Sequence, residues 1–233
     1  MKSRDRLFPY LFLLPGLIIL IVWLIYPILS ALNISLRNWS IMPDAPKPWV
    51  GLQNYTRIFS DELFWLSLKN TVFYALVTVI GQLILGLVTA LLIDNLTHGK
   101  VLFRMLYYLP VVTSWVVVSL LFKFLFNSSG SGLVNFILCD ILHLISEPVA
   151  WLTEAKTAFV VINSLGIWKG IGFSMIIFLA ALQSISLDLY EAAAIDGAGV
   201  IKKIQYVTLP GIFPTIITVS VMLLIGAFQT YVP

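Results

Sequence analysis

Few side chains in this 233-residue sequence could carry out chemistry, and they are not grouped as an enzyme needs them. The one cysteine, Cys139, excludes an intramolecular disulfide, and the two histidines, His98 and His143, lie far apart in the chain. No His, Cys, Asp or Glu residues have the spacing of metal ligands. No nucleophile is paired with an acid or base at a helix end. The sequence therefore predicts no catalytic residue, no metal site, no cofactor and no enzyme.

The sequence also lacks a phosphate-binding loop. The pattern G-x-x-x-x-G-K-[ST] does not occur, and the only Gly-Lys pair, Gly99-Lys100, is followed by Val101. The 14 lysines and arginines are scattered and form no basic stripe with interleaved aromatics, so the net charge of +3 does not indicate a nucleic-acid partner. If this chain works in an ATP-driven machine, the ATPase must be a separate protein.

Polar side chains inside long apolar runs are the residues that could guide a solute. Lys169 lies near the middle of one run, where a lysine costs about 2.5–3.5 kcal/mol on insertion scales, so we expect it to face protein or water. We interpret it as a path or gating residue, or alternatively as a partner for a backbone carbonyl or a carboxylate. Gln82, Asn163 and Trp168 also lie in apolar runs, where they could line a route or hold helices together.

The segment 183–211, between the last two apolar runs, carries dense helix signals. Ser186 can cap a helix, and Asp188 then lies in the first turn, where the helix dipole favours a negative charge. Gly197 can supply the left-handed residue that ends this helix. A second short helix can follow, and Pro210 prevents its continuation as an ordinary helix. Such a helical hairpin is more than a connection needs, which indicates a docking surface.

These residues must be positioned by membrane-spanning helices. The chain is 60% hydrophobic and only 11% charged, with a mean hydropathy of +0.99, far from the composition of a soluble domain. A span needs roughly 20 mostly apolar residues. Five stretches meet this requirement: 10–32, 71–93, 103–126, 158–182 and 212–232. The apolar segment 133–145 is too short to cross. We therefore predict an all-α polytopic transmembrane helix bundle.

The distribution of basic residues predicts the orientation, because cytoplasmic loops carry an excess of lysine and arginine. With a cytoplasmic N-terminus, the connections at 94–102 and 183–211 are cytoplasmic too. These three regions and their flanks hold Lys2, Arg4, Arg6, Lys100, Arg104, Lys202 and Lys203. The chain stops at Pro233, at the end of an apolar run, so we expect a sixth span and an incomplete C-terminus.

The segment 183–211 resembles a family pattern, E-A-A, three residues, G, nine residues, I-x-L-P, of the permease subunits of bacterial ABC importers. The chain has Glu191-Ala192-Ala193, then Gly197, then Val207-Thr208-Leu209-Pro210 at the same spacing, with Val207 in place of isoleucine. Further stretches are similar to binding-protein-dependent sugar permeases of the maltose and glycerol-phosphate type: Gly51–Tyr55, Phe64-Trp65, Lys69–Thr71, Phe103-Arg104, Leu109-Pro110, Phe122–Asn127 and Ile167–Lys169.

The resemblance implies a permease subunit that translocates a sugar or related carbohydrate across the bacterial cytoplasmic membrane. The partners it implies are ATP-binding cassette ATPase subunits, a second permease and an extracytoplasmic solute-binding protein. It implies an N-terminal helix and loop at 1–66 and a transport domain at 67–233. It also implies a cytoplasmic coupling helix in the segment 183–211. The residues that would couple to the ATPase are Glu191, Ala192, Ala193, Asp196, Gly197, Leu209 and Pro210. The alternative is a stand-alone secondary transporter or channel, which would more typically show an internal repeat.

Overall fold

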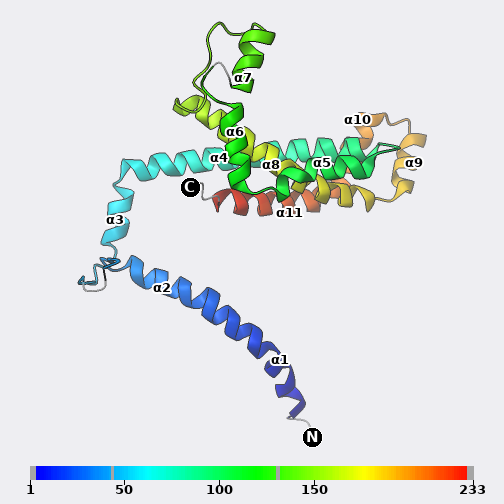
Figure 1. The fold of residues 1–233 in the computed structure, drawn as a ribbon. Helices are drawn as coiled ribbons and strands as arrows, with labels where there is room; N and C mark the ends of the chain where they lie inside the picture. Colours follow the sequence, from blue (N-terminus) through cyan, green and yellow to red (C-terminus); the bar gives the residue numbers. More distant parts are fainter. Residues whose placement is uncertain (1–3, 43–44, 130–131, 230–233) are drawn as a thin grey trace. The chain divides into compact units, whose positions relative to one another are not determined.

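The computed structural model describes residues 4–42, 45–129 and 132–229, which are helical apart from the connecting segments and one isolated bridge between Arg37 and Trp49. Two compact units, residues 1–69 and 70–233, make up the chain (Figure 1). The division falls inside α4 (Glu62–Asp94). The division into an N-terminal helix and loop at 1–66 and a transport domain at 67–233 stays a prediction.

The first unit contains one long helical run, an extended loop and a short helix. The run consists of α1 (Arg4–Leu20), a π-helical turn η1 (Ile21–Ile25) and α2 (Tyr26–Ser35), and α3 (Gln53–Phe59) follows the loop. The turn η1 ends two residues before Pro27. In an α-helix the residue at this position would donate its N–H to the carbonyl four residues earlier, but proline has no N–H. The wider turn lets the helix continue. Residues Tyr10–Ser35 are long and apolar enough to cross a membrane, as predicted.

The second unit contains the other long apolar helices. These are α4, α8 (Ala155–Gln183) and a run from Val200 to Phe228, which confirms the predicted spans at 71–93 and 158–182. The predicted span 212–232 begins earlier than expected, and its last three residues lie outside the described part of the chain. Its run joins α10 (Val200–Lys203), η3 (Ile204–Thr208) and α11 (Leu209–Phe228) without a break. As with Pro27, a π-helical turn ending two residues before Pro210 carries the helix past the proline.

The predicted span 103–126 is not one continuous helix. The chain forms two helices there, α5 (Lys100–Val112) and α6 (Trp115–Leu125), which meet at an angle of 97°. Thr113 and Ser114 between them have extended backbones, with ψ of 140° at each. Pro110, inside α5, removes one helix N–H just before this break. Apolar length alone gave no sign of the bend, because both halves are apolar.

The core of the second unit lies around α8. Met175, Phe178 and Leu182 of α8 pack with Ala90 of α4 and Ile212 of α11, and all five are at most 5% exposed. A smaller cluster joins α8 to α6 through contacts of buried apolar residues. Since α8 packs against α4, α5, α6 and α11, it is the central element of this unit.

Residues 133–145 form the short, non-spanning helical segment that was predicted, as α7 (Leu133–Phe136) and η2 (Ile137–Ile141). Asn135 is fully buried there. Its amide donates to the carbonyls of Asn127 and Val149 at 3.1 Å each, and its oxygen accepts from Trp151 Nε1 at 2.8 Å. This side chain fixes the segment that connects α6 to α8.

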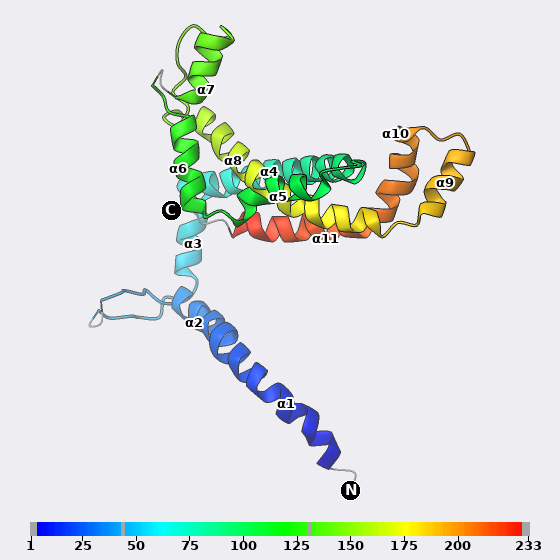
Figure 2. The ribbon, with the colours of Figure 1, turned by 45° about the vertical axis from the view of Figure 1, so that its right-hand side comes forward.

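The connection between α4 and α5 and the hairpin of α9 (Leu187–Ile195) and α10 lie at the same end of the second unit (Figures 1 and 2). Leu96 and Ile185, which follow α4 and α8, both pack against the main core cluster at that end. The prediction that residues 94–102 and 183–211 share one side of the bundle therefore agrees with the structure.

Candidate functional site

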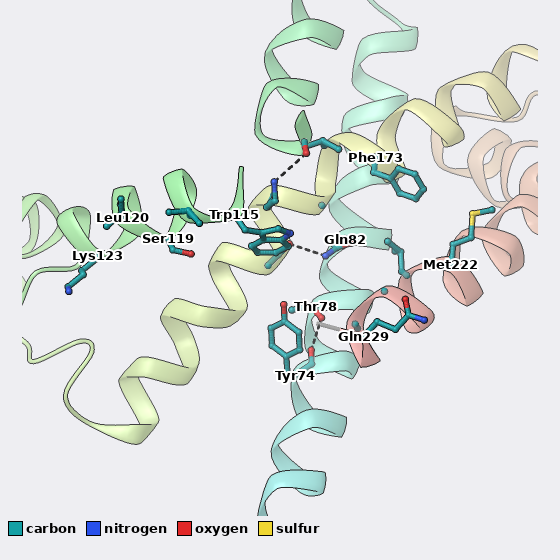
Figure 3. Close-up of a pocket in the computed structure, with 18 residues that line it drawn as sticks. Tyr74, Thr78, Gln82, Trp115, Ser119, Leu120, Lys123, Phe173, Met222 and Gln229 are labelled. Carbon is teal, nitrogen blue, oxygen red and sulfur yellow. Dashed lines mark hydrogen bonds between the residues drawn. The ribbon is translucent and has the colours of Figure 1, made fainter. Parts of the chain in front are cut away.

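A cavity of about 760 Å³ lies among the helices of the second unit (Figure 3). Its walls come from α4, the end of α5, the start and face of α6, the middle of α8 and the end of α11. The polar and aromatic lining residues are Tyr74, Thr78, Gln82, Trp115, Ser119, Lys123, Lys169, Phe173 and Gln229. These residues supply hydroxyls, amides, ammonium groups and aromatic rings, the rest of the described lining is aliphatic or glycine, and it contains no carboxylate and no histidine. This chemistry suits a polar ligand and offers no acid–base pair.

Helical spacing brings these side chains to one space. Tyr74, Thr78 and Gln82 follow one another at four-residue intervals on α4, so they lie on one helix face. Trp115 and Ser119 repeat the same interval on α6. Figure 3 shows the α4 residues and Trp115 around the same region, with Ser119 and Lys123 further along α6.

Gln82 is fixed by the glycines of α8. Its Nε2 donates to the carbonyl oxygen of Gly166 at 2.9 Å. A Cβ at Gly170 would overlap the Gln82 amide, and one at Gly166 would lie 2.7 Å from the Tyr74 hydroxyl. The G-x-x-x-G pair at 166 and 170 therefore allows α8 to approach α4 closely. The result is a cavity wall in which the Gln82 amide is held in place.

Lys169 is buried, at 7% exposure, and its ammonium faces the break between α5 and α6. Nζ donates to the carbonyls of Pro110 at 2.8 Å, Val111 at 3.3 Å and Thr113 at 2.6 Å. The same nitrogen lies 4.9 Å from the centre of the Trp115 ring. The expected alternative of a backbone-carbonyl partner therefore describes these contacts, although Lys169 also lines the cavity.

The other two path candidates do not line this cavity. Asn163 is 6% exposed and donates to the Phe159 carbonyl at 2.7 Å, while its oxygen has no hydrogen-bond partner among the described residues. Trp168 packs near Phe122, with ring centres 5.7 Å apart, and lines a separate apolar groove of about 500 Å³ beside α5 and α6. The structure thus brings Gln82 and Lys169 together and leaves Asn163 and Trp168 elsewhere.

The hairpin carrying Glu191 forms as its local signals predicted. The Ser186 hydroxyl accepts from the Asp188 amide at 3.3 Å and caps α9. Gly197 has a φ of +74°. The Ala198 amide donates to the Ala193 carbonyl at 2.9 Å and the Gly197 amide to the Ala194 carbonyl at 3.0 Å. This pair of bonds is the Schellman motif, which ends a helix at a left-handed residue.

The hairpin is closed by one polar contact and exposes most of its surface. The Tyr190 hydroxyl and Thr208 Oγ1 lie 2.9 Å apart and join α9 to η3. Glu191, Ala192 and Asp196 are exposed, while Ala193 and Leu209 are half-buried. The hairpin also exposes large apolar side chains, on α9 one turn before and after Glu191 and on α10: Leu187 at 74%, Ile195 at 86%, Val200 at 75% and Ile201 at 79% exposure. The predicted coupling residues therefore form an exposed surface at one end of the bundle, with Pro210 at its base.

Sequence reasoning missed several lining residues. Tyr74, Thr78, Lys123, Phe173 and Gln229 were not selected as path residues. The four-residue repeat of Tyr74, Thr78 and Gln82 was a usable signal, since it predicts one polar face on an apolar helix. Phe173 and Gln229 line the cavity because of the way the helices meet in the folded chain. No local sequence pattern specifies that arrangement.

Three comparisons identify similar proteins. A family model described as "Binding-protein-dependent transport system inner membrane component" matches residues 82–233. The trehalose/maltose transport system permease protein MalF of Thermococcus litoralis is 35% identical over 232 residues, which cover 99% of this chain and 77% of that protein. Among solved structures, a bacterial ABC transporter involved in the import of the acidic polysaccharide alginate matches with a TM-score of 0.82 and 30% identity. The match covers 98% of this chain and 75% of that one.

A second solved structure is that of a bacterial alginate ABC transporter in complex with an alginate pentasaccharide-bound periplasmic protein. It matches with a TM-score of 0.79 and 29% identity, covering 95% of this chain and 72% of that one. Both likenesses extend over nearly the whole chain, so they include the broken α5–α6 pair as well as the hairpin.

Proposed function

This chain belongs to the inner membrane components of binding-protein-dependent transport systems, and we propose that it translocates a sugar or related carbohydrate as the permease subunit of an ATP-driven importer. The cavity is the observation that carries the substrate class. It combines hydroxyl and amide groups with the aromatic rings of Trp115 and Phe173, a combination that binds the polar edges and apolar faces of sugars. The related permeases serve trehalose/maltose and alginate transport, which agrees with this chemistry.

The exposed hairpin is proposed as the docking surface for the ATPase. The Glu191 carboxylate is exposed, among apolar side chains that a partner could cover. An exposed acidic group within an apolar patch suits a basic or amide group on the partner. Gly197 holds the angle between α9 and α10 through its left-handed backbone. Because α9 follows α8 after three residues, a movement of the docked hairpin would be passed directly to α8.

The docking proposal is tested by reversing the charge of Glu191 in the full chain, assembled with its ATPase and binding protein. We expect Glu191→Lys to weaken co-purification of the ATPase and to abolish binding-protein-stimulated ATP hydrolysis and sugar uptake. Glu147→Lys is the control and should keep wild-type ATPase association, since Glu147 is an exposed acid in the connection between η2 and α8, outside the hairpin. Unchanged ATPase association of Glu191→Lys would refute the docking role.

The path proposal concerns the cavity. Gln82 and Lys169 line it, and Asn163 and Trp168 are retained as path candidates on sequence grounds. Gln82→Leu would remove the amide that faces the cavity while keeping a similar volume. We expect this change to raise the KM for sugar uptake, with ATPase association unchanged. A wild-type KM would argue against direct contact by Gln82.

The chain is a multi-pass protein of the inner membrane. We propose a cytoplasmic N-terminus, on the ground that three lysine- and arginine-bearing regions then share the cytoplasmic side. A second permease subunit is proposed to complete the assembly with the ATPase and the solute-binding protein. With Cys139 replaced by serine, single cysteines at Lys202 and Lys156 should label from opposite sides of the membrane. Labelling of both from one side would refute this topology.

A further inference from the structure

The break between α5 and α6 leaves backbone carbonyls without helical partners. A helix end has up to four such carbonyls, and inside a membrane they need another donor. The extended residues Thr113 and Ser114 end α5, and Pro110 cannot donate an N–H. The bend of 97° then directs α6 away from α5. Within a lipid environment, this corner needs a donor from elsewhere in the chain.

The donor is Lys169. An ammonium group has three N–H donors and no acceptor. Three carbonyls, of Pro110, Val111 and Thr113, lie within 3.3 Å of Nζ, so each N–H can be matched to one carbonyl. The site is also the C-terminal end of α5, where the helix dipole favours a cation. With its donors occupied by backbone, the ammonium has none left for a sugar hydroxyl.

The contact between Lys169 and the three carbonyls joins α8 to the corner between α5 and α6, and both sides of this contact lie beside the cavity. Lys169 lies in α8, one uninterrupted helix from Ala155 to Gln183. Three residues further along α8, Gly172 packs so closely against the Tyr107 carbonyl of α5 that a Cβ would overlap it. On the other side of the break, α6 begins with Trp115, which packs near the ammonium and lines the cavity.

We infer that Lys169 is a positioning residue that fixes the α5–α6 corner to α8, so that a movement of α8 moves the cavity wall formed by α6. This inference rests on the proposed function, since it takes the Glu191 hairpin as the point where the ATPase acts on α8. Lys169 acts on the cavity through the α5–α6 corner and through Trp115, which lies in the cavity wall. Without the ammonium, only apolar packing further along α6 would hold that helix to α8, and the corner at Thr113 and Ser114 would lose its polar attachment.

Two other roles would have different consequences. If Lys169 bound substrate directly, its removal would raise the KM for transport and leave the corner unchanged. If it only filled space, a methionine of similar length would replace it. The three carbonyl contacts argue against both of these roles. The contacts depend on the charge and the N–H donors of Lys169 and not on its volume.

The first test needs neither ATPase nor binding protein. Spin labels at Met105 of α5 and Phe124 of α6, both exposed, report the corner in the purified full chain, with Cys139 replaced by serine. We expect one narrow distance distribution in this background and a broad or shifted one in Lys169→Met. Lys169→Arg, which keeps cationic donors, should preserve the narrow distribution. An unchanged distribution in Lys169→Met overturns the inference.

The second test is made in the assembled transporter. Lys169→Met should keep ATPase association and hydrolysis but lower the maximal uptake rate at least about tenfold, with KM unchanged. Lys169→Arg should recover most of the rate. Lys156→Met is the matched control, since Lys156 is an exposed lysine in the first turn of α8, and it should transport like wild type. A raised KM with an unchanged maximal rate would assign Lys169 to the substrate and overturn the inference.

The two tests separate the inference from the proposed function. If the wild-type assembly takes up no carbohydrate, the proposed function fails, while the spin-label measurement still reports on the corner. If wild type transports and Lys169→Met transports equally fast, the positioning role fails alone.

Discussion

Replacing Gly197 tests how much of the docking surface depends on one backbone angle. Gly197 has a φ of +74°, and a Cβ built there meets nothing within 4 Å. The cost of Gly197→Ala is therefore conformational and not steric. For an L-residue the left-handed region costs roughly 1–2 kcal/mol. If the hairpin must adopt this conformation to dock, the affinity for the ATPase should fall about 5–30-fold.

The assay is a binding titration of the ATPase against the full chain in nanodiscs, together with hydrogen exchange of the Ala198 amide. That amide donates to the Ala193 carbonyl in the Schellman motif, so it should exchange faster in Gly197→Ala. Gly197→Asn should lose less affinity, since asparagine tolerates the left-handed region.

Gly199→Ser is the control for this prediction. Gly199 also has open space around it, but its φ is −69°, and it stands at the N-cap of α10, where serine is favoured. It should bind the ATPase like wild type. Wild-type affinity and wild-type exchange in Gly197→Ala would refute the reasoning, because the turn would then not need its left-handed residue.

Two further changes test the packing that supports the site. Gly172→Ala should destabilise the protein by about 1–3 kcal/mol, because its Cβ would overlap the Tyr107 carbonyl. Thermal unfolding in detergent measures this loss. Gly16→Ala is the control and should leave stability unchanged, because Gly16 has open space around it. Asn135→Ala should speed hydrogen exchange near α7 and lower the free energy of unfolding by about 1–3 kcal/mol, because Trp151 Nε1 loses its buried acceptor. Unchanged exchange near α7 would contradict the assigned role of Asn135.

The sequence by itself determined the features that depend on local interactions. Apolar length and composition predicted the spans, since a membrane helix satisfies its own backbone hydrogen bonds and needs only apolar side chains outside. The cap at Ser186, the first-turn Asp188 and the turn at Gly197 were also predictable, because each acts within a few residues of its partner. The exposed hairpin followed from these signals together with the family pattern that contains Glu191.

Only the tertiary structure decided how the apolar helices bend and meet. The corner between α5 and α6 was predicted as one span, because Pro110, the local signal nearest the break, does not specify a bend of 97°. The side chain that satisfies the corner, Lys169, lies 56 to 59 residues further along the chain from the carbonyls it binds. The cavity likewise needs five helices to meet. Such features depend on hydrogen bonds and packing between distant segments, which residue types and spacing along one helix do not specify.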